Sequence, residues 1–254
     1  AAGGKSKPSV AASVGVQVLS YHTEASIGQG AHITSSGDME VKAQNLIGLQ
    51  NLALAGGGSK GGAAVGGAIA VNIFPDVTTE ALIGAARVDV LKALTVSAQS
   101  SLVEAPAPTV PLITLPKLSS VALAGGISSG GAVVTGSVIV DVVSLTTTAS
   151  IADGAEVNQH PLSGWIPDST QTVSVTATDI THMTNLAGTL SLSSGGAGVG
   201  LGLVVDVFTK QVSASIGNAT VSAAGDVTVT ATSTENLTEL AVDASGSSSS
   251  AAVD

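Results

Sequence analysis

The sequence predicts an all-β protein, a β-solenoid of the parallel β-helix type built from about four repeats of roughly 55 residues. Three observations predict it: a phrase that recurs four times, apolar residues that alternate with a period of two, and glycine-rich segments between the strands. The phrase is VGVQVLSYHTEASIG from Val14, GAIAVNIFPDVTTEALIG ending at Gly84, GSVIVDVVSLTTTASIA ending at Ala152, and GLVVDVFTKQVSASIG ending at Gly217.

The spacing of the phrase defines the modules. The isoleucines near the ends of the copies, Ile27, Ile83, Ile151 and Ile216, are separated by 56, 68 and 65 residues. Insertions near 104–117 and 159–170 account for the longer intervals. We therefore expect a single elongated array over 1–254, with modules at approximately 1–55, 56–123, 124–192 and 193–254. The insertions contain six of the eight prolines, and we expect them to be loops that leave the scaffold.

The alternation within each module predicts strands. In the last module Val227, Val229 and Ala231 share one face, and threonines occupy the other, as in half-buried strands. The first strand of a module differs, because both of its faces are apolar: Val138, Val140 and Val142 on one, Ile139 and Val143 on the other. We expect that strand to be covered on both sides.

Composition limits the alternatives. Aromatic residues make up 2% and charged residues 10%, which disfavours a string of small β-sandwiches, each with its own bulky core. The number of β-coils per module stays open. A net charge of −10 with eight Lys and Arg argues against nucleic acid as a partner. The stretch 118–140 has no charge but is rich in Gly, Ser and Thr, and we expect no membrane insertion.

The repeated phrases VGGAIAVNIF, TTEALIG and LTVSAQS, with their later copies VIVDVV, TTTASI and VSVTATD, resemble those of large bacterial surface proteins. These are the leukotoxin-type filamentous adhesins and giant autotransporter-like repeat proteins. The resemblance covers nearly the whole chain apart from the two insertions. It implies an extracellular β-helical fibre, stalk or adhesin shaft at the bacterial cell surface, with a structural role in cell adhesion.

One column of polar residues is the candidate site. Asp141 and Asp206 occupy the same position in their repeats, where earlier copies have Asn72 and Gln17. Stacked carboxylates could hold Ca²⁺, but amides replace them in two copies, which favours a polar ladder. Two unpaired carboxylates on neighbouring coils would repel each other, so something must separate or neutralise them. Whether Asp141 and Asp206 bind a cation stays open.

Other polar residues are scattered. The four histidines, His22, His32, His160 and His182, lie in different repeat contexts, and we expect Asp179 and His182 to form an exposed contact. We assign no catalytic, cofactor-binding or metal-binding residues and no enzymatic activity. The single tryptophan, Trp165, either contacts a partner or belongs to a loop that covers the flank of the array.

The repeats, together with the resemblance to bacterial surface proteins, predict a structural segment of an extracellular bacterial filament. Both ends of the chain lie within a repeat, so we expect it to be cut from a longer array. The expected partners are neighbouring copies or further repeats stacked end to end, and also cell-surface glycans or receptors. The alternative is a polysaccharide-binding or -cleaving β-helix protein.

Overall fold

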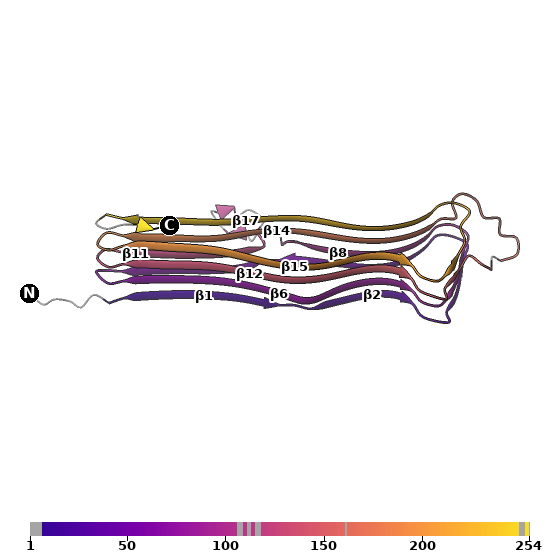
Figure 1. Cartoon of the computed structure of the whole chain (residues 1–254), viewed down its shortest axis with the longest axis horizontal. Helices are drawn as coiled ribbons and strands as arrows, with labels where there is room; N and C mark the ends of the chain where they lie inside the picture. The colour runs from indigo at the N-terminus through magenta and orange to yellow at the C-terminus, as the bar shows by residue number, and fades with distance from the viewer. Residues whose placement is uncertain are drawn as a thin grey trace, which may run out of the picture.

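The computed structural model describes residues 7–105, 109–110, 113–114, 118–160, 162–248 and 252–253. Within these ranges the regular structure is entirely β-strand, so none of it is a helix that could span a membrane. The body is elongated, and the long strands run along its longest axis (Figure 1). The prediction of an all-β chain with parallel strands is confirmed, and the architecture is compatible with a β-helix or solenoid.

Apart from one two-stranded hairpin, the described strands form two long sheets and one short sheet. Sheet I contains β1 (Ser9–Val18), β2 (Tyr21–Ile27), β6 (Ala64–Ile83), β12 (Val133–Ile151), β15 (Gly198–Ile216) and β18 (Ala252–Val253). Sheet II contains β4 (Met39–Leu49), β5 (Asn51–Ser59), β8 (Leu94–Glu104), β11 (Ser120–Ser128), β14 (Val173–Ser193) and β17 (Val227–Ser247). Sheet III contains β3 (His32–Ser35), β7 (Arg87–Val90), β13 (Glu156–Val157) and β16 (Thr220–Val221).

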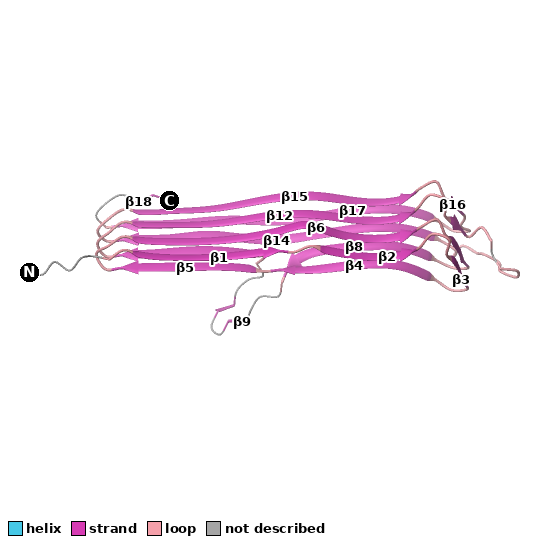
Figure 2. Cartoon of the chain, turned by 90° about the horizontal axis from the view of Figure 1, so that it is seen from below, coloured by secondary structure: helices cyan, strands magenta, loops and turns pink. Residues whose placement is uncertain are grey.

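The chain visits the sheets in a fixed order. It runs along sheet I, crosses at one end of the body through sheet III, returns along sheet II, and turns at the opposite end into the next strand of sheet I (Figures 1 and 2). We call each such passage a circuit and name it by its first strand: the β1, β6, β12 and β15 circuits. The long strands make each circuit wide and flat.

Pairing between circuits is parallel and in register. In sheet I, β6 pairs with both β1 and β2, and β12 pairs with β6 and β15. Equivalent residues of the recurring phrase are therefore neighbours, as in Ile27, Ile83, Ile151 and Ile216. The register shifts where β6 carries Pro75, between Val143 and Leu145 on one side and between Val18 and Tyr21 on the other. A proline lacks the backbone N–H that a regular ladder position needs, and a bulge accommodates it.

Two segments interrupt the succession of long strands where the sequence has its insertions. The first follows β8 and carries the short hairpin of β9 (Thr109–Val110) and β10 (Ile113–Thr114), which projects from the middle of the body (Figure 2). The rest of 106–117 lies outside the described residues. The second lies between β13 and β14 and extends beyond the ends of the long strands (Figure 1).

The interior changes character along the strands. In the half of the body next to sheet III, aliphatic residues such as Val88, Val96 and Val175 are buried between the sheets. The middle contains the largest buried side chains, including Phe74 and Met183. In the half next to the opposite turns, which we call the glycine half, the buried residues are mainly alanine, serine, asparagine and glycine, with Ile139 among the few larger ones.

The structure contradicts the prediction that the first strand of a module is covered on both sides. The first strand of the β12 circuit is not covered on both sides, because Val142 is 38% exposed and Val134 is 48% exposed. Ile139 and Val143 point into the interior and are fully buried. The valine side of this strand is the outer surface of sheet I.

Serine–glycine turns connect sheet II to sheet I at the glycine end. The Ser128 hydroxyl accepts a hydrogen bond from the backbone N–H of Gly131 at 2.9 Å and donates to the carbonyl of Gly62 in the preceding turn at 2.6 Å. Ser193 repeats both contacts, with Gly196 N–H and the Gly131 carbonyl. Each turn is therefore bonded to the turn below it, and the close approach leaves no room for side chains.

We predict that Gly131→Ala destabilises the protein by about 2 kcal/mol, because overpacking a tight site costs roughly that much. A Cβ at this position would lie 2.3 Å from the carbonyl carbon and oxygen of Gly62. Denaturant unfolding measures the loss. Gly67→Ala is the control, since a Cβ there meets nothing within 4 Å. Equal stability of the two variants would show that the turns are not tightly stacked.

Candidate functional site

The predicted polar column lies in the interior, where the glycine half meets the middle of the body. Gln17, Asn72, Asp141 and Asp206 are consecutive partners across β1, β6, β12 and β15. A second row, Asn51, Ser120, Asn185 and Glu239, is formed in the same way in sheet II. Asn72 and Asp141 are fully buried, and Asn185 is 1% exposed. We call the two rows together the polar column.

Hydrogen bonds join the two rows and the successive circuits. The Asn72 amide donates to Asp141 Oδ1 at 2.5 Å and to the Ser120 hydroxyl at 2.7 Å. Asn51 Nδ2 donates to Asn72 Oδ1 at 2.9 Å. The amides of Asn51 and Asn72 thus bond both within their own circuit and to the neighbouring circuit. The polar ladder predicted from the sequence is present.

Asn185 bridges the two carboxylates. Its Nδ2 donates to Asp141 Oδ2 at 2.8 Å and to Asp206 Oδ2 at 2.9 Å. Sequence reasoning required something to separate or neutralise the acids but did not identify this residue, because Asn185 comes from the opposite sheet. The sequence did contain a signal for this asparagine, because Asn-Leu pairs recur at 51–52 and 185–186.

Burial raises the pKa of Asp141, although its hydrogen bonds from Asn72 and Asn185 act in the opposite direction. The pKa of Asp206 is raised to about 7, first by burial, then by the negative charge of Asp141 and by Glu239. A carboxylate next to a like charge holds its proton more tightly. Amide donors therefore stabilise the negative charge of the acids, and a proton bound near neutral pH removes part of it.

A second buried charge lies further along the strands. Asp179 of β14 is fully buried, and Lys210 of β15, whose side chain is 8% exposed, forms an ion pair with it. Lys210 Nζ also donates to the Thr181 hydroxyl at 3.0 Å and lies 3.3 Å from a Glu235 carboxylate oxygen. The predicted exposed contact between Asp179 and His182 is wrong. Residues three apart in a strand point to opposite faces, so Asp179 points inward and His182 outward.

A hydrogen-bonded cluster anchors the second insertion. Asp89, 1% exposed, accepts from Arg87 Nε at 2.8 Å and from the backbone N–H of His160 at 2.9 Å. Asn158 has a φ of 57°, and its Oδ1 accepts from Val90 N–H at 2.7 Å. Asparagine tolerates this left-handed conformation better than most residues. The base of the loop is fixed by these bonds.

The loop beyond this base is largely exposed. Ile166 is 86% and Leu162 is 54% exposed, and Trp165 between them is half-buried. The loop projects past the strand ends, away from the flat faces of the long sheets (Figure 1).

The histidines do not converge. His22 lies 3.5 Å from Glu24 on β2, and His160 lies 3.6 Å from Glu156 beside β13. His32 is on β3 and His182 on β14. Among the residues that the structure describes, no group of three or more His, Asp or Glu is arranged to hold a metal ion.

We predict that Asp206→Asn weakens the pH dependence of stability. The folded-state pKa of about 7 lies above the ordinary 3.8, so the folded chain binds this proton more tightly and the free energy of unfolding falls as the pH rises from 3.8 to about 7. Because Asp206 is half open to solvent, we expect Asn to stabilise by only about 1 kcal/mol at pH 8 and by little at pH 4. Urea unfolding at both pH values measures this. The exposed Asp76→Asn is the control, and a parallel pH profile for wild type and Asp206→Asn would contradict the prediction.

We predict that Lys210→Met lowers the free energy of unfolding by about 3 kcal/mol, because it leaves a buried carboxylate unpaired. Adding Asp179→Ser should restore most of the loss. Serine occupies the paired positions Ser100 and Ser233 in the neighbouring strands. Chemical denaturation of both variants measures the difference. If the double variant is as unstable as the single one, the ion pair is not the reason.

Comparisons of this chain with protein-family models, with curated proteins and with solved structures find no match. The polar column, the buried ion pair and the stacked turns are therefore the basis on which a function can be proposed.

Proposed function

We propose that the chain is a structural segment of an extracellular bacterial filament, stalk or adhesin shaft, folded as a β-solenoid of about four modules of roughly 55 residues. The observation that carries the proposal is the in-register parallel pairing of every long strand with its equivalent in the next circuit. Each module is then one wide coil, made of one circuit. The placement at a bacterial cell surface rests on the resemblance of the repeated phrases to filamentous adhesins.

The interior supports a scaffold role. Asp141 and Asp179 are fully buried and bonded to partners from the opposite sheet. A polysaccharide-cleaving β-helix, the alternative function, would need acids that reach a substrate in an open cleft. Acids enclosed between two sheets serve cohesion between coils instead.

The two ends of the polar column are complementary. At the β1 end the column terminates in sheet I at the half-buried Gln17, and at the β15 end it terminates in the carboxylates of Asp206 and Glu239. Inside the chain an amide already donates to the acid of the next circuit, as Asn72 does to Asp141. Stacking β1 of a further unit on β15 would repeat this contact, with Gln17 beside Asp206.

The edges are suited to such stacking. The strands at either end of a parallel sheet present unpaired backbone N–H and C=O groups that can pair with another chain. Sheet I ends in β1 and β2 on one side, and on the other, within the part of the chain that the structure describes, β18 pairs with β15 at Gly198 and Val199. From Gly200 onward β15 can therefore pair with a further coil, whether of the same array or of another copy.

We predict that Gln17→Glu reduces end-to-end association at least tenfold at pH 8, because it places a carboxylate beside Asp206, and tenfold corresponds to about 1.4 kcal/mol. At pH 5 protonation of Asp206 should relieve part of the defect. Electron microscopy of filament length and sedimentation velocity measure association. Val16→Glu is the control, since Val16 points to the outer surface and is 59% exposed. Globular, non-associating wild-type particles would argue against the proposed function.

A further inference from the structure

The usual distribution of polar and apolar residues is reversed in the glycine half. Along β14, Ser174, Thr176 and Thr178 point outward near sheet III, but Leu190 and Leu192 point outward near the glycine turns. The inward positions change in the opposite sense, from Val173 and Val175 to serine and threonine. The outer face of β14 is therefore polar near sheet III and apolar near the glycine turns, and its inner face shows the reverse.

The outer surface of sheet II in the glycine half forms a continuous apolar surface, which we call the leucine face. Its outward positions come from 52–58 of β5, 121–127 of β11, 186–192 of β14 and 240–246 of β17, and all of them are apolar residues or glycine. The side chains are well exposed: Leu52 48%, Leu54 54%, Ile127 59%, Leu190 44%, Leu192 40% and Leu240 52%. None of the chain's 26 charged residues occupies these positions.

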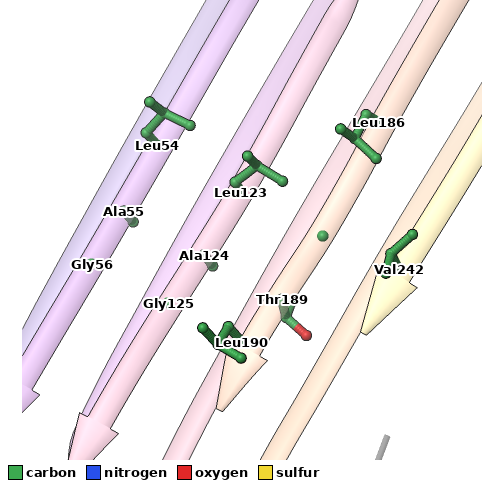
Figure 3. Close-up of a pocket in the computed structure, with 11 residues that line it drawn as sticks. Leu54, Ala55, Gly56, Leu123, Ala124, Gly125, Leu186, Thr189, Leu190 and Val242 are labelled. Carbon is green, nitrogen blue, oxygen red and sulfur yellow. The ribbon is translucent and has the colours of Figure 1, made fainter. Parts of the chain in front are cut away.

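A trough runs across the leucine face. Its volume is about 750 Å³, and glycines at 56, 125 and 188 form part of its lining. Leu54 and Leu123 lie on one side and Leu190 on the other (Figure 3). Because the glycines have no side chains, aliphatic side chains from a facing surface can enter between the leucines.

We propose that the leucine face packs against the leucine face of a second copy of this chain, sheet on sheet. Each of β5 and β11 has nine residues. Nine residues at about 3.3 Å each, over four strands about 4.8 Å apart, cover roughly 570 Å² per copy, and the pair buries about 1,100 Å². That is just above the roughly 1,000 Å² that a biological interface needs. The face carries no charge, so the net charge of −10 does not oppose close approach there.

A second copy fits this face better than a lipid bilayer does. Among the described strands, β4, β5 and β17 form unpaired edges of sheet II, and in hydrocarbon their unpaired backbone groups would each cost several kcal/mol. Packing two sheets face to face leaves those edges in water. It also uses the same surface on both partners, which is the arrangement of a two-fold symmetric pair. This lateral contact is separate from end-to-end stacking and does not depend on the proposed function.

The test uses sedimentation equilibrium at pH 8 of the chain with Gln17→Glu, which is expected to weaken end-to-end stacking, so that the lateral contact can be measured separately. We expect a dimer that dissociates on dilution. Leu123→Lys with Leu190→Lys should raise the dissociation constant at least tenfold. Thr176→Lys with Thr230→Lys, on the same outer surface near sheet III, should leave it unchanged. Thermal unfolding establishes that each variant is folded.

A second measurement does not depend on the lysine variants folding. The chain contains no cysteine, so Leu123→Cys introduces a unique thiol. We expect a short bis-maleimide to cross-link copies through Leu123→Cys but not through the control Thr176→Cys. A monomer at every concentration, or equal cross-linking of both variants, overturns the proposal. Flotation of the monomeric chain with phosphatidylcholine vesicles, lost in the double leucine variant, would also overturn it and would assign the face to lipid.

Discussion

The rest of the structure depends on the in-register parallel pairing of successive circuits. Each paired residue lies beside its equivalent in the next circuit, so the side chains at one repeat position are stacked about 4.8 Å apart. A residue that cannot tolerate its own copy cannot be repeated. Small and β-branched residues satisfy this condition, which explains a chain dominated by Gly, Ala, Ser, Thr and Val. At the turns the condition is strictest, and Gly131 directly contacts the backbone of Gly62.

Stacking also determines how charge can be placed inside. Identical carboxylates in successive circuits would repel, and the structure uses two means to avoid it. In the polar column the amide of Asn185, from the opposite sheet, bridges Asp141 and Asp206. The pKa of Asp206 is also raised, so that this carboxyl group binds a proton more tightly. At Asp179 a lysine from the opposite sheet compensates the charge, and the equivalent residues in neighbouring strands are the neutral Ser100 and Ser233. Buried charge therefore occurs where the opposite sheet supplies a partner.

The reversed faces of the glycine half have the same origin. Where alanine, serine and glycine line both sheets, the sheets are held together by small side chains and by hydrogen bonds such as that from Asn72 to Ser120. Leucines cannot fit there, and they point outward. The glycine half thus forms cohesive contacts along the stack but leaves apolar surface on its flanks, and that surface is where lateral association between rods is proposed.

The sequence by itself determined that the chain is built from strands and that Gln17, Asn72, Asp141 and Asp206 are aligned, because in-register stacking follows directly from spacing along one chain. It could not determine which side of a strand is interior. Alternation shows which residues share a face. In the glycine half one face carries small residues and the other carries larger apolar residues, so the valines of β12 were expected to be covered. Only the tertiary structure decided which side of β12 is interior. Only the tertiary structure brought Asn185 to Asp206 and Lys210 to Asp179, because these contacts cross between the sheets and depend on how the two sheets pack.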